Sequence, residues 1–479
     1  MSARGCEHFE RYKSNPKNMD SLKWTHMVFV VGNSCEAKAL KICNVYCRAC
    51  KKRGPSMHVC LDCYYFGCRN HMREHTAVEG HLFSMDLSYG QLHCTPCGDY
   101  IYDAAFDAIA WKNKMRAGRF KKRLFDCTSW DPTDEERQLL AHRTERICIG
   151  PDSMMGLRGL VNMGSTCYLN CIVQALIHTP PLRDYFLAER HKCKGVSGDD
   201  GSKLAYVSQL FQEFYKGSTI PLALPDLLNL TWSEAPHLAG CVQQDAHEFF
   251  IAILNVLHKH CSETVVKPTP INACPCIIHQ IFTGHLQSDV VCQNCNGVST
   301  KIELSWDFSL DLGPVTLNGR PPCSLADCLE RFTSVEHLGK REKIFCENCG
   351  SNQESTKQFT MKMLPIVAIF HLKRFEHLEN GGRKITTSIS FPEMLDLTPF
   401  MSRRKNRTAF PFDNRYSLFA VVNHCGSNFS GGHYTAFVRQ QQDYWYQCDD
   451  TFVTRAKLNE VLNSEGYILF YHKHVLEYE

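Results

Sequence analysis

The feature that most constrains the fold of this chain is the crowding of cysteine and histidine into its first hundred residues. Ten of the 27 cysteines and seven histidines lie between Cys6 and Cys97. Three pairs of cysteines are separated by two residues: Cys47 and Cys50, Cys60 and Cys63, and Cys94 and Cys97. Such a pair can direct two thiolates onto one ion, and tetrahedral zinc needs two half-sites of this kind. The pattern predicts a metal-stabilised module.

Further donors complete this segment: Cys6 with His8, Cys68 with His71, and His75 with His81. The total is enough for three closed four-ligand sites, and a closed site is structural because no coordination position is open. A segment with few long apolar runs needs the folding free energy that metal binding supplies. We interpret the other histidines His26 and His58 as surface residues.

The cysteine content also bears on the compartment. The chain has no apolar stretch of signal-peptide or membrane-span length. We therefore expect no membrane contact and reduced cysteines that act as metal ligands, a nucleophile or small buried residues rather than disulfides. The net charge of +3 argues against a surface devoted to DNA or anionic lipid.

We divide the chain into three parts. Residues 1–110 form the zinc module, residues 111–150 a basic helical linker, and residues 151–479 a larger second domain. The segment Asp103–Asp126 has helical propensity, and seven Lys or Arg residues lie between Lys112 and Arg123 without an acid. The second domain mixes strand-like runs at 365–372, 417–422 and 433–438 with amphipathic helices.

One cysteine in the second domain has the setting of a nucleophile. Gly159 and Gly164 permit a tight backbone just before an apolar helical pattern that begins at Cys167 and stops at Thr179-Pro180. The N–H groups and dipole of a helix N-terminus favour an anion, and the thiolate is the nucleophilic form of cysteine. Cys171, one turn further, is expected in the core.

A thiol nucleophile needs a base, and the base needs an orienting partner. His433 follows Gly431 and Gly432 at the start of a strand-like run. Asp449 lies sixteen residues later, on what reads as the returning strand of a hairpin. One imidazole nitrogen could then face Cys167 while the other donates to Asp449.

These two segments resemble those of the ubiquitin-specific protease family of papain-like cysteine deubiquitinases. Three further segments are also similar to this family: Gln243–Phe250, Trp306–Leu312 and Phe370–Phe375. In the first, Asp245 and Glu248 are spaced to cap a helix. The resemblance covers residues 156–475 and implies an α+β fold with a helical thumb, a β-rich palm and β fingers that hold ubiquitin.

The same resemblance implies roles for individual residues. Cys167 would be the nucleophile, His433 the base and then the acid, and Asp449 the orienting group. Asn162 would bind the oxyanion together with the Cys167 backbone N–H. The expected substrate contacts are Gly431, Gly432 and Tyr434, which would form a cleft for the thin Gly-Gly end of ubiquitin.

The N-terminal spacing resembles the UBP-type zinc finger over residues 5–100. This resemblance implies three ligand sets: Cys6, His8, Cys94 and Cys97; Cys47, Cys50, Cys68 and His71; and Cys60, Cys63, His75 and His81. Members that bind the ubiquitin tail carry an arginine and flanking aromatics where this chain has Asn70, His93 and Thr95. We therefore expect a protein-docking module.

One or two further zinc sites are expected in the second domain. Cys292, Cys295, Cys346 and Cys349 form a four-thiolate set that resembles the finger-tip zinc of the family. A mixed set resembles one in the SAGA-module proteases: His258, Cys274, Cys276 and His279. His260 and Cys261 compete for that second set, and His258 could instead cap its helix. His191 and Cys193 read as surface residues without a second half-site.

The domain order and ligand pattern resemble the deubiquitinases of the SAGA coactivator. This implies a nuclear enzyme that removes ubiquitin from monoubiquitinated histone H2B, with a second core histone as a further candidate, and three small activating partners. It also implies an isolated chain that is nearly inactive. One alternative is a catalytically silent scaffold that binds ubiquitin or a complex. Another is a nucleic-acid binder that uses Lys112–Arg123; auxiliary contact of this stretch with nucleosomal DNA is the weaker form of this hypothesis.

Overall fold

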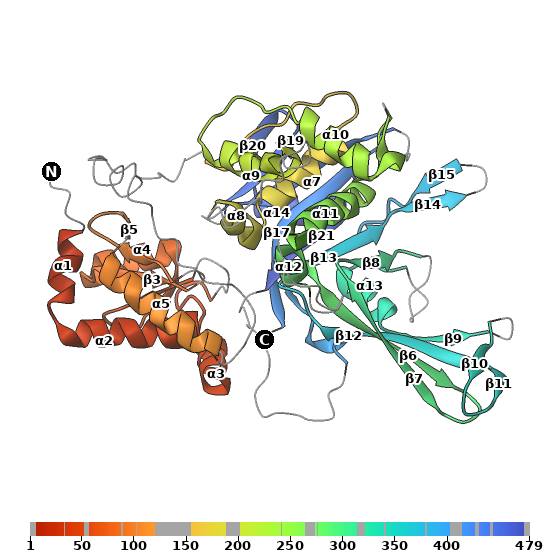
Figure 1. Cartoon of the computed structure of the whole chain (residues 1–479), viewed down its shortest axis with the longest axis horizontal. Coiled ribbons are helices and arrows are strands. Elements are labelled where there is room, and N and C mark those ends of the chain that lie inside the picture. The colour runs from red at the N-terminus through yellow and green to blue at the C-terminus, as the bar shows by residue number, and fades with distance from the viewer. Residues whose placement is uncertain are drawn as a thin grey trace.

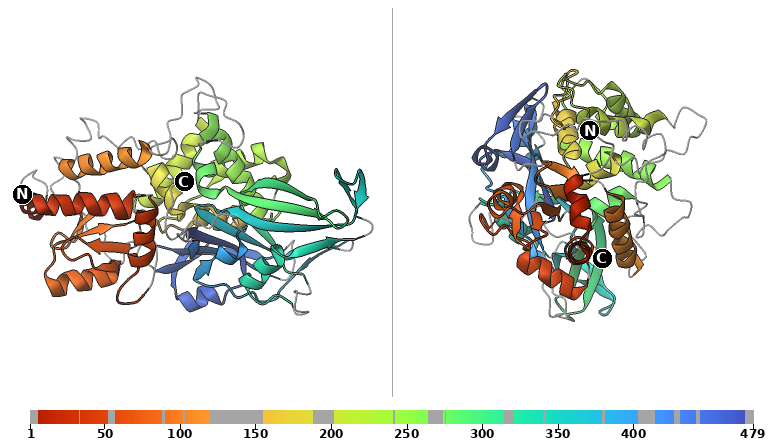
Figure 2. Two further views of the ribbon diagram at one scale, coloured as in Figure 1. Left: turned by 90° about the horizontal axis from the view of Figure 1, so that it is seen from below. Right: turned by 90° about the vertical axis from the view of Figure 1, so that its left-hand side faces the viewer.

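A computed structural model describes residues 6–119, 155–187, 202–263 and 274–473, apart from residues 33, 52–56, 88–89, 102, 241, 275, 314–320, 340–341, 379–380, 403–413, 427–430 and 441–443. The N-terminal module lies at one end of the molecule, a helical layer against a sheet lies in the middle, and long hairpins project at the other end (Figure 1). The left view of Figure 2 shows the same order along the longest axis.

The N-terminal module is built on a five-stranded antiparallel sheet with the order β2-β1-β3-β4-β5. Its strands are β1 (Met57–Cys60), β2 (Phe66–Cys68), β3 (Phe83–Asp86), β4 (Leu92–Cys94) and β5 (Asp99–Ile101). The surrounding helices are α1 (Glu7–Lys13), α2 (Pro16–Thr25), the π-helix η1 (His26–Val30), α3 (Cys35–Asn44), α4 (Arg69–Glu79) and α5 (Ala104–Arg119). Three of the strands end on a predicted metal ligand.

Local signals explain the helix boundaries of this module. Asn15 accepts a hydrogen bond from the Lys17 N–H, and Pro16 occupies the first turn of α2. Gly80, with a φ of 69°, ends α4 in the left-handed region. Phe9 and Phe83 meet edge to face at 5.7 Å and anchor the core between α1 and the sheet.

The interpretation of His26 and His58 as surface residues was wrong. Both side chains are buried. His58 Nε2 lies 3.0 Å from the Tyr100 hydroxyl, and His26 Nδ1 lies 3.4 Å from the Asn113 amide on α5. The two rings therefore tie elements of the module together. Sequence spacing alone does not indicate such contacts.

The helices that we call the thumb begin with the buried α7. The helices are α7 (Cys167–Ile177), α8 (Pro180–Leu187), α9 (Ser202–Tyr215), α10 (Pro225–Glu234), the 3-10 helix η2 (Pro236–Leu238), α11 (Ala246–Glu263) and α12 (Ile277–Phe282). Every residue of α7 is buried. The predicted stop at Thr179-Pro180 divides α7 from α8, because proline is tolerated in the first turn of a helix.

The sheet that we call the palm has the order β20-β19-β18-β17-β21-β13-β8, with β16 paired to β17. Its strands are β8 (Phe308–Asp311), β13 (Val367–Lys373), β16 (Met394–Asp396), β17 (Arg415–Cys425), β18 (His433–Arg439), β19 (Trp445–Asp449), β20 (Phe452–Ala456) and β21 (Gly466–Lys473). The three strand-like runs of the sequence correspond to β13, β17 and β18. Smaller elements accompany the sheet: α13 (Leu325–Phe332), η4 (Thr398–Phe400), α14 (Leu458–Leu462), β14 (Phe375–Leu378) and β15 (Gly381–Lys384).

The projecting hairpins, which we call the fingers, form a four-stranded sheet with the order β7-β6-β12-β9. Its strands are β6 (Gly284–Cys292), β7 (Val298–Ser305), β9 (Val335–Leu338) and β12 (Ser355–Met363). The pair β10 (Ile344–Cys346) and β11 (Ser351–Gln353) lies at the tip (Figure 1).

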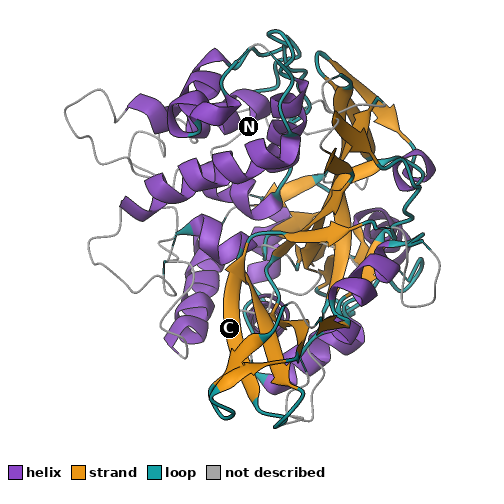
Figure 3. Cartoon of the chain, turned by 90° about the vertical axis from the view of Figure 1, so that its right-hand side faces the viewer, coloured by secondary structure: helices purple, strands orange, loops and turns teal. Residues whose placement is uncertain are grey.

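The thumb packs on one side of the palm, so helices and strands are segregated (Figure 3). One buried cluster joins α7 to Ala420 and Val422 of β17 and to β18. A second cluster contains Leu418 and Val421 of the same strand, together with α13. The predicted α+β fold is confirmed. None of the described helices combines the length and apolar character needed to cross a bilayer.

Candidate active site and metal sites

Cys167 is the first residue of α7, and its side chain is buried. The approach to it is tightly wound. Gly164 has a φ of 99°, and Ser165 has a φ of 56°, which is uncommon for a residue with a Cβ. The Met163 N–H donates to the Thr166 hydroxyl at 2.9 Å. This bond and the two turn residues fix the direction in which α7 starts, and with it the direction of the Cys167 thiol.

Asn162, the predicted oxyanion donor, organises this approach. Its Oδ1 accepts hydrogen bonds from the N–H groups of Gly164 and Thr166, each at 3.1 Å. Its Nδ2 donates to Asp450 Oδ2 at 2.9 Å. One amide hydrogen is therefore occupied, and an amide nitrogen carries two. The side chain can still offer a hydrogen to a developing oxyanion.

A second amide lies closer to the thiol and was not expected from the sequence. Gln243 Nε2 donates to Cys167 Sγ at 3.7 Å. The residue lies just before α11, in the segment Gln243–Phe250 that suggested the family. Asp245 in that segment caps α11, since its Oδ1 accepts from the N–H groups of His247 and Glu248 at 2.6 and 3.3 Å.

The structure brings His433 and Asp449 together as the hairpin β18–β19 predicts. His433 Nε2 donates to Asp449 Oδ1 at 2.6 Å. This bond leaves Nδ1 as the nitrogen that can act on another group. Among the described residues, no hydrogen bond joins the Cys167 thiol to the His433 imidazole.

Asp450 is a second residue of the site that the sequence analysis did not single out. Its two carboxylate oxygens accept from Asn162 at 2.9 Å and from Asn170 at 2.8 Å. Its Oδ2 also lies 4.0 Å from His433 Nε2. Its φ of 47° is uncommon for a residue with a Cβ, and its side chain is 15% exposed, compared with 47% for the neighbouring Asp449. The only signal in the sequence is the doubled aspartate at the end of β19.

Burial opposes the thiolate that the helix terminus was expected to favour. The pKa of the Cys167 thiol is raised, first by burial, and the Asp450 carboxylate adds to this. Backbone N–H groups of Tyr434 and of α7 lower the pKa of the thiol, but their combined effect is smaller than that of burial. A base is therefore needed to form the nucleophile.

The three predicted substrate contacts, Gly431, Gly432 and Tyr434, differ in how far the structure leaves them open to a substrate. A Cβ on Gly432 would lie 2.6 Å from the Cys425 carbonyl oxygen, so this glycine is required by packing. A Cβ on Gly431 would meet nothing within 4 Å, so the backbone there is open. Tyr434 is buried, and its ring packs at 4.7 Å against His424. Its ring therefore belongs to the core, and only its backbone faces the thiol.

The structure gathers the predicted zinc ligands into five groups in which all donor atoms lie within 4.8 Å of one another. The groups are Cys6, His8, Cys94 and Cys97; Cys47, Cys50, Cys68 and His71; Cys60, Cys63, His75 and His81; His258, Cys274, Cys276 and His279; and Cys292, Cys295, Cys346 and Cys349. The side chains of the competitors His260 and Cys261, and both His191 and Cys193, lie outside the described residues.

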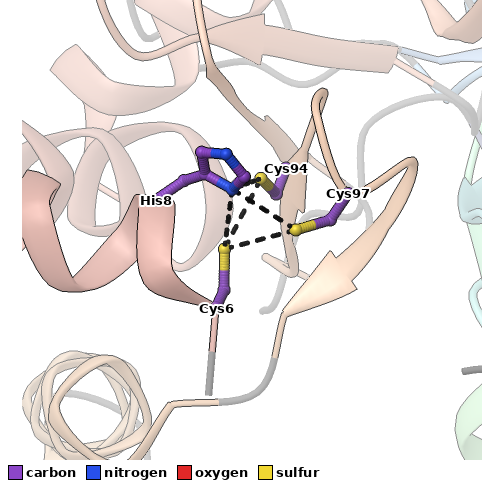
Figure 4. A group of neighbouring side chains, drawn as sticks. All are labelled: Cys6, His8, Cys94 and Cys97. Carbon is purple, nitrogen blue, oxygen red and sulfur yellow. Dashed lines mark hydrogen bonds between the residues drawn. The ribbon is translucent and has the colours of Figure 1, made fainter. Parts of the chain in front are cut away.

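The spacing of these donors fits zinc. In the first group, Cys6 Sγ lies 3.6 Å from Cys94 Sγ and 3.5 Å from Cys97 Sγ, and Cys97 Sγ lies 3.5 Å from His8 Nδ1 (Figure 4). Zinc–sulfur bonds of about 2.3 Å in a tetrahedron place ligand atoms roughly 3.8 Å apart. The distances between sulfur atoms are therefore those of atoms that share one ion rather than those of disulfides.

Comparison with known proteins identifies the class. The family profile "Ubiquitin carboxyl-terminal hydrolase" matches residues 158–471, and "Zn-finger in ubiquitin-hydrolases and other protein" matches residues 47–106. The chain belongs to the ubiquitin carboxyl-terminal hydrolase family. As the sequence predicted, it is a thiol-dependent ubiquitinyl hydrolase with an N-terminal zinc-binding finger.

Relatives of this hydrolase match over its whole length. It is 47% identical to ubiquitin carboxyl-terminal hydrolase nonstop of Drosophila melanogaster, over 100% of both chains. It is 46% identical to ubiquitin carboxyl-terminal hydrolase 22 of Homo sapiens, over 99% of this chain and 96% of that one. A chain in the solved structure of the SAGA Ubp8/Sgf11/Sus1/Sgf73 DUB module bound to ubiquitin aldehyde is similar with a TM-score of 0.64 and 28% identity, covering 98% of this chain and 99% of that one.

Proposed function

We propose that this hydrolase cleaves the isopeptide bond after the last glycine of ubiquitin through Cys167, His433 and Asp449. The observation that carries the proposal is the 2.6 Å bond from His433 Nε2 to Asp449, because it leaves Nδ1 to take the proton of a buried thiol. The Cys167 sulfur attacks the glycine carbonyl, and His433 returns the proton to the leaving lysine amine. Water then releases ubiquitin from the thioester.

The oxyanion of each tetrahedral intermediate needs donors that are already in place. The Cys167 backbone N–H and the Asn162 amide serve here, with Gln243 as a further amide at the thiol. Loss of one such donor typically costs about 10²–10³ in rate. The open backbone at Gly431 leaves room for the Gly-Gly end of ubiquitin.

We propose further that the substrate is monoubiquitinated histone H2B in nucleosomes, with a second core histone as a candidate, and that the enzyme works in the nucleus. The support is the similarity to a chain of the SAGA DUB module, which was solved with ubiquitin aldehyde and with monoubiquitin. By the same similarity, partners like Sgf11, Sus1 and Sgf73 would dock on the chain and activate it.

The metal content is part of the proposal. The five donor groups would hold five structural zinc ions, three in the module 1–110 and two in the domain 151–479. Each set of four donors closes a tetrahedron, so these ions would stabilise the fold and would take no part in the reaction. The predicted linker 111–150 overlaps helix α5, whose Asn113 contacts His26 of the module, so residues up to Arg119 belong to the module and the rest of the stretch would be the linker.

The test is labelling and turnover in the complex purified with its partners. We expect wild type to form an adduct with ubiquitin vinyl sulfone and to clear ubiquitin from H2B in nucleosomes, and Cys167→Ala to do neither. Cys171→Ala, one turn inside the same helix, is the matched control and should retain both. The isolated wild-type chain should hydrolyse ubiquitin-AMC much more slowly than the complex.

Absence of an adduct at Cys167 in the intact complex would favour the silent scaffold instead. Full activity of the isolated chain would contradict the proposed dependence on partners. Cleavage of free ubiquitin chains without removal of ubiquitin from nucleosomes would contradict only the proposed histone substrate and not the proposed chemistry.

A further inference from the structure

Lys384, at the end of β15, carries a buried ammonium group. Its side chain is 1% exposed, and Nζ donates to the His424 carbonyl at 2.6 Å, to the Gly426 carbonyl at 3.0 Å and to Glu465 Oε2 at 2.8 Å. An ammonium has three donors, and here all three are used. A buried lysine without such partners is rare, because the charge loses its hydration.

The two carbonyls lie at the end of β17 that faces the start of β18. In the register of this pair, His424 is opposite Tyr434 and Cys425 is opposite His433. The held carbonyls of His424 and Gly426 thus flank the residue directly across from His433. The ammonium therefore holds the end of β17, the backbone segment that pairs with His433.

The glycine segment before His433 rests on the same backbone. A Cβ on Gly426 would lie 2.8 Å from Gly432 Cα and 2.9 Å from the Gly431 oxygen. The contacts are between main chains, with no flexible side chain between them. A shift of the end of β17 is therefore passed to Gly431, Gly432 and His433 together.

We propose that Lys384 is a positioning residue for His433. Its ammonium joins the ends of β15 and β17 to Glu465, which directly precedes β21, and in this way fixes the backbone position from which the His433 side chain extends. The inference rests on the proposed role of His433 as the base. The charged and titratable groups around His433 are Asp449 at the end of β19, Asp450 directly after it, and His424 and Cys425 at the end of β17. Lys384 touches none of the reacting atoms.

The experiment compares Lys384→Met and Lys384→Gln with wild type in the intact complex, using ubiquitin-AMC. A base displaced by about one ångström costs up to about 10²-fold. We expect kcat at pH 7 to fall about 10- to 100-fold in Lys384→Met, with less loss in Lys384→Gln, while KM stays within about threefold. The pH profile should change as well. With the base misplaced, the rate should follow spontaneous ionisation of the thiol and keep rising with pH where wild type levels off.

For each variant, ubiquitin binding and thermal unfolding measure the folded fraction of the enzyme. The kcat of the variant is then normalised to this fraction. Lys373→Met is the matched control, because that lysine is 45% exposed and pairs only with the exposed Asp311 at the palm surface in the described structure. It should leave the kinetics unchanged. His433→Ala is measured in parallel.

The inference would be overturned if the pH profile of Lys384→Met ran parallel to that of wild type and its loss of kcat equalled the unfolded fraction. Failure of both Lys384 variants to fold would also overturn it, since the side chain would then serve the whole fold. An active His433→Ala would refute the proposed base itself. A dead His433→Ala beside an unimpaired Lys384→Met would refute only the positioning role.

Discussion

At the reacting sulfur, two physical effects oppose one another. The N-terminus of α7 favours an anion, but burial of Cys167 raises the pKa of its thiol and the second effect is larger. The protonated thiol is thus the resting form, and in the proposed mechanism His433 removes the proton.

This balance predicts the pH dependence of alkylation. Because the pKa of the Cys167 thiol is raised, its reaction with iodoacetamide in the isolated chain should be slower at pH 7 than that of a free cysteine and should rise with pH beyond the range where free cysteine levels off. Mass spectrometry of the Cys167 peptide measures the rate. A plateau below pH 8 would contradict the burial argument.

Asp450 predicts a second effect at the scale of the residue. Asp450→Ala leaves the amides of Asn162 and Asn170 without their acceptor, and each bond to a charged group contributes about 1.5–3 kcal/mol. Because the bond to Asn162 is exposed and contributes less, we expect kcat to fall at least about tenfold and the free energy of unfolding to fall by about 2–4 kcal/mol. Asp311→Asn, at an exposed ion pair, should cost under about 1 kcal/mol.

At the scale of the element, the active site is assembled from segments that touch backbone to backbone. The Leu160 N–H donates to the Asp450 carbonyl at 2.7 Å, and Gly159 lies against Thr451. The loop before α7 and the turn after β19 therefore hold each other. This contact links the backbone that leads to Cys167 with the backbone that follows Asp449.

Gly159→Ala tests this contact. A Cβ there would lie 2.6 Å from the Thr451 carbonyl carbon, so the turn must shift. Overpacking of this kind costs about 1–3 kcal/mol, and we expect kcat to fall more than ubiquitin affinity. Gly339→Ala, where a Cβ would meet nothing within 4 Å, is the control. Equal kinetics of the two variants would show that the contact is not needed.

At the scale of the whole molecule, the catalytic domain buries histidines that must stay neutral. Burial lowers the pKa of His178, the C-cap residue of α7, and of His472 on β21 to about 4. Above pH 6.5 the imidazole is neutral in both folded and unfolded chains. Between pH 6.5 and 4 only the unfolded chain takes up the proton, so stability is lost as pH falls.

Each histidine should cost about 2 kcal/mol of unfolding free energy between pH 7 and pH 5. Urea unfolding of the full chain at the two pH values, with zinc release followed in parallel, measures the loss. The double variant His178→Gln with His472→Gln should lose less stability over this range than wild type. An identical loss would assign the acid sensitivity to other groups, such as the zinc ligands or the buried His371 and His424.

The sequence by itself determined the chemistry of this protein: which residues can bind zinc, which cysteine begins a helix after a glycine-rich approach, and which histidine and aspartate share a hairpin. Spacing and periodicity carry these features because they are local. Only the tertiary structure decided that burial outweighs the helix terminus at Cys167, and that His26 and His58 are core residues. The contacts of Asp450 and the proposed positioning role of Lys384 also depend on the tertiary structure. Asp450 acts on Asn170, 280 residues away, and such a contact exists only after the palm has folded against the thumb.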